Sequence, residues 1–211
     1  MNKRTWMVLA GIWMVTLIGC AGKGEVVALN LHAIAPAEAP KAQPANDTIV
    51  VVADFDDARP DKERLGVRSH WGGGESVFNV PGGKASAVVA QVVIDYLKKR
   101  GWRVQSARPV AGTAPDGGPH VTLSGKILEL SADAKSTFGS TTITAKSKTV
   151  IEALNAEDGS IVRMTLSGSG TQTVVVFDPE DAEDLLSGAL SESLEKFVTD
   201  TKIEKKMLRL K

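Results

Sequence analysis

Few side chains in this sequence have the type and spacing that catalysis or metal binding requires. Cys20 is the only cysteine, so no intrachain disulfide can form. The histidines at 32, 70 and 120 lie far apart, and none has a second histidine or a cysteine at the spacing of a zinc site. The serines of Ser167-Gly168-Ser169-Gly170 fall within a predicted strand and lack the strand-to-helix turn of a nucleophile elbow. We therefore expect no catalytic residue, no bound metal and no cofactor.

The densest group of charged side chains follows the first predicted strand. Within it, Asp54, Asp56, Arg59 and Lys62 form a candidate partner-docking or ligand-binding loop, because ligand sites of α/β proteins tend to lie at the carboxyl ends of central strands. The spacing of the carboxylates does not match a calcium-binding EF-hand loop. The alternative is a solvated loop whose charges pair with one another, and each such surface pair is worth little.

The residues before Cys20 have the three parts of a secretory signal. Lys3 and Arg4 are followed by an uncharged, mostly apolar stretch over residues 5–18, and the small residue Gly19 stands directly before Cys20. The apolar stretch is shorter than the roughly 20 residues that a transmembrane helix needs. We therefore expect residues 1–19 to be a signal peptide that is removed.

The tetrad Leu17-Ile18-Gly19-Cys20 resembles the lipobox of bacterial lipoproteins. The resemblance implies cleavage between Gly19 and Cys20 and acylation of the Cys20 sulfur and of the new amino terminus. Two or more acyl chains anchor a protein stably, whereas one holds it only marginally. In such lipoproteins an Asp after the cysteine favours the inner membrane, so Ala21 implies the periplasmic face of the outer membrane. The alternative is a plain secretory signal with an incidental cysteine.

The charge balance gives no indication of a nucleic-acid partner. The chain has 25 basic and 25 acidic residues, and loss of residues 1–19 removes two basic residues, which leaves a formal charge of −2. Nucleic-acid-binding domains usually carry a basic excess. The expected partners are the membrane, through acyl chains on Cys20, and other envelope proteins.

The mature chain is expected to begin with a flexible tether at residues 20–47. Pro36, Pro40 and Pro44 recur among Ala, Glu, Lys and Gln, a composition that buries too little apolar surface to order the chain. A Pro-containing segment stays extended at roughly 3 Å per residue, so the tether would let the folded body stand well off the bilayer. Within it, the more apolar residues around Val26 are a candidate edge strand. A single periplasmic domain is expected at 48–211.

The domain is predicted to start with a strand, a helix and a second strand. Residues 48–55 form a continuous β-branched run, which is typical of a strand buried on both faces. A charged, glycine-rich loop is expected at 56–75, followed by a short strand at 76–80. Apolar residues at helical spacing predict a helix over 84–100. A strand is predicted to follow from residue 102.

Three strands and a helix complete the predicted domain. The strands span 120–131, 141–154 and 160–177, and the pair Asp158-Gly159 indicates a hairpin between the last two. A helix is predicted over 179–208, with basic residues at its C-terminal end. The sum is an α+β fold, a two-layer domain with a mixed β-sheet (β-α-β followed by an antiparallel three-stranded meander) and two long helices packed on one face.

The segment Asp57-Ala58-Arg59-Pro60-Asp61-Lys62, followed by Leu65-Gly66, resembles a motif of the YajG-type family of small envelope lipoproteins. The order of the predicted elements over 48–200 is similar as well, whereas the glycine segment 71–75 and the loop 107–119 depart from the family pattern. The resemblance implies a location at the periplasmic face of the envelope. We expect a non-enzymatic, lipid-anchored protein that docks to other envelope proteins. The alternative is a binding module for a small envelope ligand, a glycan or a lipid.

Overall fold

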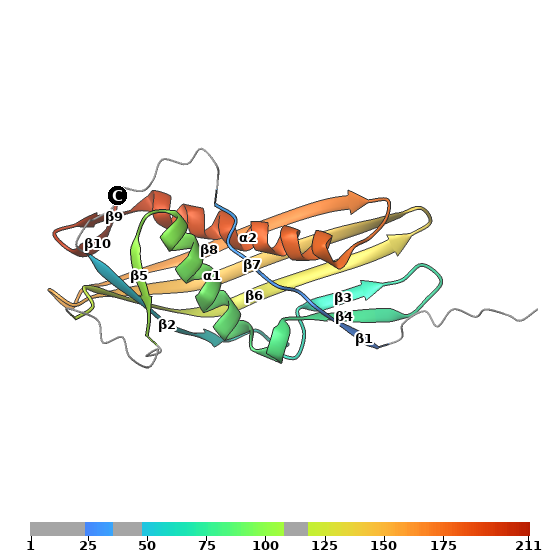
Figure 1. Cartoon of the computed structure of the whole chain (residues 1–211), viewed down its shortest axis with the longest axis horizontal. Coiled ribbons are helices and arrows are strands. Elements are labelled where there is room, and N and C mark those ends of the chain that lie inside the picture. The colour runs from blue at the N-terminus through green and yellow to red at the C-terminus, as the bar shows by residue number, and fades with distance from the viewer. Residues whose placement is uncertain (1–23, 36–47, 108–117) are drawn as a thin grey trace, which may run out of the picture.

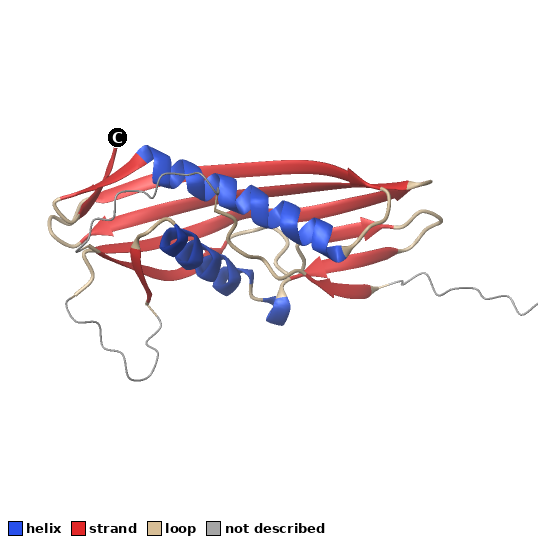
Figure 2. Cartoon of the chain, turned by 45° about the horizontal axis from the view of Figure 1, so that its top comes forward, coloured by secondary structure: helices blue, strands red, loops and turns tan. Residues whose placement is uncertain are grey.

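The structure is a computed structural model that describes residues 24–35, 48–107 and 118–211. Within these residues one mixed eight-stranded sheet carries two α-helices, so the predicted α+β class is confirmed. Figures 1 and 2 show an elongated molecule whose two helices lie on the same face of the sheet. Gly19, Cys20 and the predicted signal peptide lie outside the described residues.

The β-branched strand predicted from the sequence is β2 (Ile49–Asp57), an inner strand of the sheet. It pairs in parallel with β5 (Arg103–Ser106) on one side and with the first half of β6 (Val121–Thr137) on the other. Helix α1 (Ala85–Lys99) packs its apolar stripe against β2 and β5. Gly101 follows the helix with a φ of 85°, a left-handed conformation that favours glycine.

Three long strands form the other half of the sheet. β6 pairs with β7 (Ser140–Asn155), and β7 pairs with β8 (Ile161–Val174), both in antiparallel register. The turn between β7 and β8 contains Asp158 and Gly159, as the sequence predicts, and Gly159 has a φ of 68°. A β-bulge interrupts the pairing of β6 with β7 at Leu128.

Helix α2 (Pro179–Asp200) lies across β6, β7 and β8. It begins with a capping box in which the side chains of Asp178 and Asp181 accept backbone N–H groups at its first turn. The helix approaches β8 so closely that a Cβ atom on Gly168 would lie 1.9 Å from the carbonyl oxygen of Ala189. The glycines in this serine-rich part of β8 therefore serve helix packing.

The predicted loop at 56–75 is wrong in its extent. β2 continues to residue 57, and β3 (Gly66–Ser69) forms an antiparallel hairpin with β4 (Glu75–Asn79) before the short 3-10 turn η1 (Pro81–Gly83) leads into α1. β3 also pairs with β6 beyond the point where β2 ends. A Cβ on Gly66 would meet a backbone carbonyl of β6 at 1.9 Å, so only glycine fits at the start of β3.

The predicted end of the last helix is also wrong. α2 stops at Asp200, and β9 (Thr201–Glu204) and β10 (Met207–Leu210) form a separate hairpin. This hairpin is held to the domain by the buried side chain of Asn155, which accepts the backbone N–H of Leu208 at 2.7 Å and donates to its carbonyl at 3.1 Å. The lysines after residue 200 therefore belong to the hairpin and do not complement a helix dipole.

The predicted tether at 20–47 is wrong for the part of it that the structure describes. β1 (Glu25–Ala28) pairs in parallel with β4 at an edge of the sheet, which confirms the candidate edge strand around Val26, and the chain continues as an extended segment through residue 35, the last residue of this described range. Leu29 and Ala33 are buried in the same core as the two helices, and Leu31 is 9% exposed. Residues 36–47 of the predicted tether lie outside the described residues.

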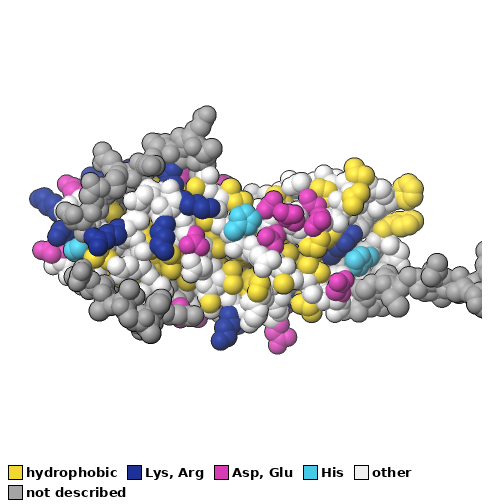
Figure 3. All heavy atoms as spheres, in the orientation of Figure 1, with side chains coloured by type: hydrophobic (Ala, Val, Ile, Leu, Met, Phe, Trp, Pro, Cys, Tyr) yellow, Lys and Arg dark blue, Asp and Glu magenta, His cyan; other side chains and the backbone are white. Residues whose placement is uncertain are grey.

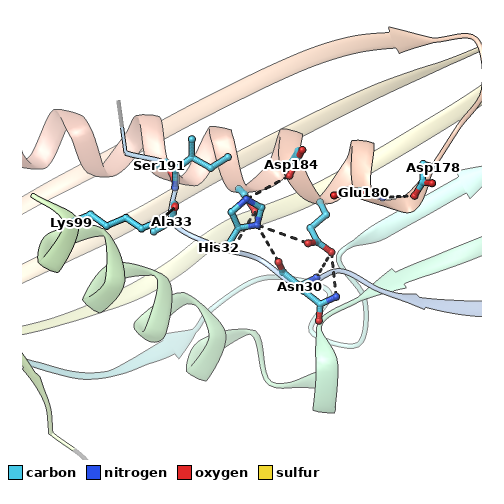
Figure 4. Close-up of polar contacts among 11 residues, drawn as sticks. Asn30, His32, Ala33, Lys99, Asp178, Glu180, Asp184 and Ser191 are labelled. Atoms are coloured by element: carbon cyan, nitrogen blue, oxygen red, sulfur yellow. Dashed lines mark hydrogen bonds and ion pairs between the residues drawn. The ribbon is translucent and has the colours of Figure 1, made fainter. Parts of the chain in front are cut away.

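The extended segment at 29–35, here called the strap, is bonded along α2 (Figure 4). The backbone N–H of Asn30 donates to Glu183 at 2.7 Å. The N–H groups of His32 and Ile34 donate to the hydroxyls of Ser187 and Ser191 at 3.1 and 2.9 Å, while Lys99 of α1 donates to the carbonyl of Ala33. The acceptors on α2 are four residues apart, which is a rise of about 6 Å, and the donors on the strap are two residues apart, which is a span of about 6.6 Å. The donors and acceptors therefore stay in register along the helix.

Candidate functional site

Arg59, which the sequence places in a candidate docking loop, is an internal anchor of that loop. Its residue surface is 5% exposed. The Nε and Nη2 atoms donate to the two carboxylate oxygens of Asp57 at 2.9 and 2.8 Å. Nη1 donates to the carbonyls of Arg64 and Leu130 at 2.9 and 3.4 Å, and Nη2 also donates to the carbonyl of Lys62 at 3.4 Å. All five N–H groups of the guanidinium are therefore used inside the protein.

The same contacts fix the protonation state and the course of the loop. The hydrogen bond from Arg59 is the main reason that the pKa of Asp57 lies below its usual value, although partial burial acts in the opposite direction. At the loop surface Arg64 donates to Asp61 at 2.6 Å, which lowers the pKa of that carboxyl. Leu65 then enters the core with 2% exposure. The contacts of Arg59 at its start and the buried Leu65 at its end thus fix the loop to the rest of the domain.

The other predicted site residues do not join Arg59 in one cluster. Asp54 and Asp56 are exposed on β2, and the side chain of Lys62 is exposed on the loop. The carboxylate that pairs with Arg59 is Asp57. The Asp-x-Arg spacing in the sequence could have indicated this pair, because two residues separated by one in an extended chain lie on the same side of it.

A groove of about 550 Å³ opens beside this loop, between it and the bulged part of β6. Charged side chains of both signs and apolar side chains such as Leu65 and Val67 line it, so the lining alone does not select between a polar and an apolar ligand. One of its carboxylates, Asp133, already accepts the backbone N–H of Val67 at 3.1 Å. The charged residues of the groove other than Arg59 are Asp61, Arg64, Glu129, Asp133 and Lys148.

A buried polar group joins the two helices. The hydroxyl of Tyr96 on α1 donates to Glu195 on α2, and Arg100 donates to the same carboxylate at 3.2 Å. Burial raises the pKa of the Tyr96 hydroxyl, and the neighbouring Glu195 adds to the shift. A tyrosine held protonated in this way is a hydrogen-bond donor between helices and is unsuited to act as a nucleophile.

β8 forms one edge of the sheet among the described strands. It pairs with β7 along its length, and no described strand pairs with its other side. From Met164 to Phe177 the strand and its continuation carry no Asp, Glu, Lys or Arg. Two points of the edge are covered from α2, where Lys196 donates to the carbonyl of Ser167 at 2.8 Å and Glu192 accepts the backbone N–H of Ser169. Charged side chains are a usual means of blocking edge pairing, so these two block the middle of β8, whereas residues 171–177 carry no charge of their own.

One end of the molecule carries a cluster of exposed apolar side chains, here called the apolar tip: Trp71, Phe138, Val175 and Val176. Trp71 is 66% exposed and the other three are 82% exposed. The rings of Trp71 and Phe138 meet edge to face with their centroids 5.5 Å apart. Sequence reasoning missed this cluster, because the valines read as the end of a strand. The available signal was an aromatic residue beside glycine in each of two turns.

The described residues hold neither a metal-binding cluster nor a membrane-spanning helix. They contain no group of three or more His, Cys, Asp or Glu side chains placed to hold a metal ion. Likewise, none of the helices in the described ranges has the length and apolar character needed to cross a membrane.

Comparisons with known proteins place the chain by its fold alone. No protein-family model matches the chain, and no curated protein matches its sequence. Protein XCC0632 from Xanthomonas campestris, of the family DUF330, has 11% identity and a TM-score of 0.50 over 82% of this chain and 92% of its own. A Helicobacter pylori protein described as a homolog of a neuraminyllactose-binding hemagglutinin has 13% identity and a TM-score of 0.42, over 84% and 94%. The lipoprotein GNA1162 from Neisseria meningitidis has 12% identity and a TM-score of 0.37, over 67% and 94%. The chain therefore shares its fold with the Xanthomonas protein.

Proposed function

We propose that this chain is a non-enzymatic lipoprotein of the bacterial envelope that docks to another envelope protein. Acyl chains on Cys20 would hold it at the periplasmic face of the outer membrane. The anchor is supported by the lipobox-like tetrad that ends at Cys20 and by the resemblance to the YajG-type family. The observation that carries the docking role is the outer edge of β8 after Ser169, which no described strand pairs with and whose residues carry no charge.

An edge of this kind can pair with an extended segment of another protein. Its backbone N–H and C=O groups are the binding groups of strand addition, and side chains on alternate sides set the specificity. Thr171, Gln172 and Thr173 are exposed near the end of β8, where they would flank an added strand. The charged loop around Arg59 supports the same choice, because its guanidinium is already committed to internal acceptors.

The anchor is tested by mass spectrometry of the N-terminal peptide of the mature protein purified from membranes. We expect the peptide to begin at Cys20 and to carry acyl chains, and we expect Cys20→Ser to abolish both features. A mature peptide that begins elsewhere, or an unmodified Cys20, would refute the anchor.

Docking is tested by placing a photo-cross-linking amino acid at Thr171 in the full chain expressed in intact cells. We expect one dominant protein adduct, and we expect no adduct with the same probe at the exposed Lys206 of the C-terminal hairpin. Thr171→Lys in combination with Thr173→Lys should abolish the adduct by placing charge on the edge. The matched control Thr199→Lys, on the exposed surface of α2, should leave it unchanged. Equal adducts at Thr171 and Lys206 would count against docking through this edge.

The second candidate function is the binding of a small envelope ligand, a glycan or a lipid, and the groove beside β6 favours it. Its volume of about 550 Å³ lies within the usual range for ligand sites. A glycan that copurifies with the detergent-solubilised protein, and that is lost in a Lys148→Glu variant, would favour this function over docking.

A further inference from the structure

We infer that the apolar tip contacts the lipid bilayer in which Cys20 is anchored. This inference rests on the acylation of Cys20 proposed above, and it gives the folded body a defined orientation on the membrane. It also replaces the expectation that a long tether holds the body away from the bilayer.

The first argument is the reach of the chain between Cys20 and the folded body. The backbone N–H of Gly24 donates to the carbonyl of Glu75 at 3.0 Å, and β1 runs beside β4 from that point. Glu75 directly follows the turn that carries Trp71. Gly24 is the fourth residue after Cys20, and four fully extended residue steps span about 14 Å at most. Acyl chains on Cys20 would therefore bring this end of the molecule to the membrane surface.

The second argument is that several segments present uncharged surface at this end. The turn of the β3–β4 hairpin at 70–74, the β6–β7 turn with its flanks at 136–142, and the end of β8 at 171–177 contain no Asp, Glu, Lys or Arg. The ring contact of Trp71 with Phe138 joins the first two segments. The pairing of residue 141 with residue 174 places the third beside the second.

The side chains of the apolar tip suit the boundary of a bilayer. Tryptophan is enriched at membrane–water interfaces, where its ring is apolar and its N–H remains near polar groups. Phenylalanine and valine gain by burial among acyl chains, and exposed apolar clusters of soluble domains usually mark a contact surface. Because the anchor lies within about 14 Å of Gly24, at the same end of the molecule, the bilayer is the apolar phase nearest to the tip.

The third argument is the charge at the opposite end. The turn of the β9–β10 hairpin exposes Lys205 and Lys206, far along the molecule from β3 and β4 (Figure 1). Figure 3 shows hydrophobic side chains gathered at the right-hand end of the molecule, and Lys and Arg side chains at the left-hand end. A molecule that stands on its apolar tip keeps this charged end in water.

The test is quenching of tryptophan fluorescence by brominated acyl chains, with the acylated mature protein reconstituted in phospholipid vesicles. The mature chain contains Trp71, which is exposed, and Trp102, which is 8% exposed. We expect brominated lipids to quench a large part of the emission, and Trp71→Phe to remove the part that is quenched. Trp102→Phe should leave the quenched part in place.

A spin label at a second position distinguishes contact of the apolar tip with the bilayer from exposure of the tip to water. The chain has no cysteine besides Cys20, so Phe138→Cys provides one reactive thiol in the acylated protein, and Lys206→Cys is its control at the far end. We expect a spin label at 138 to be several-fold less accessible to a water-soluble relaxation agent than a label at 206.

The outcomes are distinguishable from those of the anchor test. An acylated Cys20 with equal accessibility at 138 and 206 would overturn the tip contact and leave the anchor standing. An unmodified Cys20 would overturn both. Efficient disulfide dimers of unlabelled Phe138→Cys chains, without quenching of Trp71 by brominated lipid, would assign the tip to a second copy of the chain and overturn the membrane contact.

Discussion

Replacement of Arg59 decides whether the charged loop is a structural anchor or a binding site. In Arg59→Ala, the Asp57 carboxylate, whose side chain is only 17% exposed, loses both bonds to its cation. The carbonyls of Arg64 and Leu130 lose a donor as well. Removing one partner of a largely buried ion pair typically costs about 3–5 kcal/mol. We expect the free energy of unfolding to fall by that amount.

The assay is urea unfolding of the mature domain, followed by circular dichroism, with the midpoint and slope fitted separately. Arg64→Ala is the matched control in the same loop. Arg64 pairs with Asp61 at 2.6 Å, but both side chains are about half exposed, and such pairs contribute about 0.2–1 kcal/mol. Arg59→Lys should fall between the two, because lysine keeps the charge but lacks the planar fork that reaches Asp57 and the carbonyls together.

The reasoning fails if Arg59→Ala changes the free energy of unfolding by less than about 1 kcal/mol, the range of an exposed pair. Such a variant that also lost a protein adduct or a copurifying ligand would restore Arg59 to the binding role that the sequence suggested. Loss of binding together with a large loss of stability would leave the structural role intact, because a loosened loop disturbs its whole surroundings.

Three further predictions test other contacts. Gly168→Ala should destabilise the domain by about 1–3 kcal/mol, because the added methyl group overpacks against α2. Gly188→Ala, on the open side of that helix, should stabilise the domain by up to about 1 kcal/mol. Thermal unfolding of both variants measures the two effects, and equal effects would contradict the prediction. Leu29→Ala should lower the free energy of unfolding by about 2–5 kcal/mol because Leu29 is fully buried, whereas Val26→Ala should lower it little because Val26 is 66% exposed. If urea unfolding showed no effect of Leu29→Ala, the strap would be a flexible tether after all. The pKa of Asp57 is lowered on folding, so the contribution of its carboxylate to stability is complete above about pH 4 and is lost as the pH falls through the lower folded-state pKa. The difference in unfolding free energy between the native protein and Asp57→Asn should therefore shrink in acid. A difference that does not depend on pH would contradict the ion pair.

The long elements were predictable because their patterns are strong over many residues. The β-branched run of β2 and the apolar stripe of α1 each determine one structure locally. The three long strands follow from extended runs separated by turn residues, and the capping of α2 follows from Asp178 and Pro179. β6, β7 and β8 pair in chain order, as neighbouring strands tend to do, whereas β2 pairs with β5 and β6, which do not follow it directly in the sequence.

The short elements were not predictable, because partners distant in sequence determine them. The strap alternates Leu29, Leu31 and Ala33 toward the core, but its backbone donors are satisfied by side chains of α2 more than 150 residues later. The proline-rich composition after it pointed to a tether. β9 and β10 depend in the same way on the buried amide of Asn155. Four-residue strands carry too little local pattern to compete with such contacts.

The candidate site was half predictable for a related reason. A cluster of charges after an inner strand is visible in the sequence. Which carboxylate pairs with the arginine depends on the alternation of side chains along β2, which puts Asp57 rather than Asp56 on the side of Arg59. The apolar tip is a harder case. Its members come from three turns that lie far apart along the chain, and only the pairing of β3 with β4 and of β6, β7 and β8 gathers them.

The two proposed surfaces share one uncharged stretch of chain and are separable by position along it. β8 ends at the apolar tip, so on a molecule that stands on this tip the strand runs away from the membrane, and a docked strand would lie along the long axis of the molecule. A charge at Thr171 would then weaken docking and leave the bilayer contact intact. A charge at Val175 would weaken the bilayer contact and leave the edge above it free. If Thr171→Lys and Val175→Lys instead impaired both activities equally, a single surface for one partner would explain the uncharged stretch better than an edge and a tip.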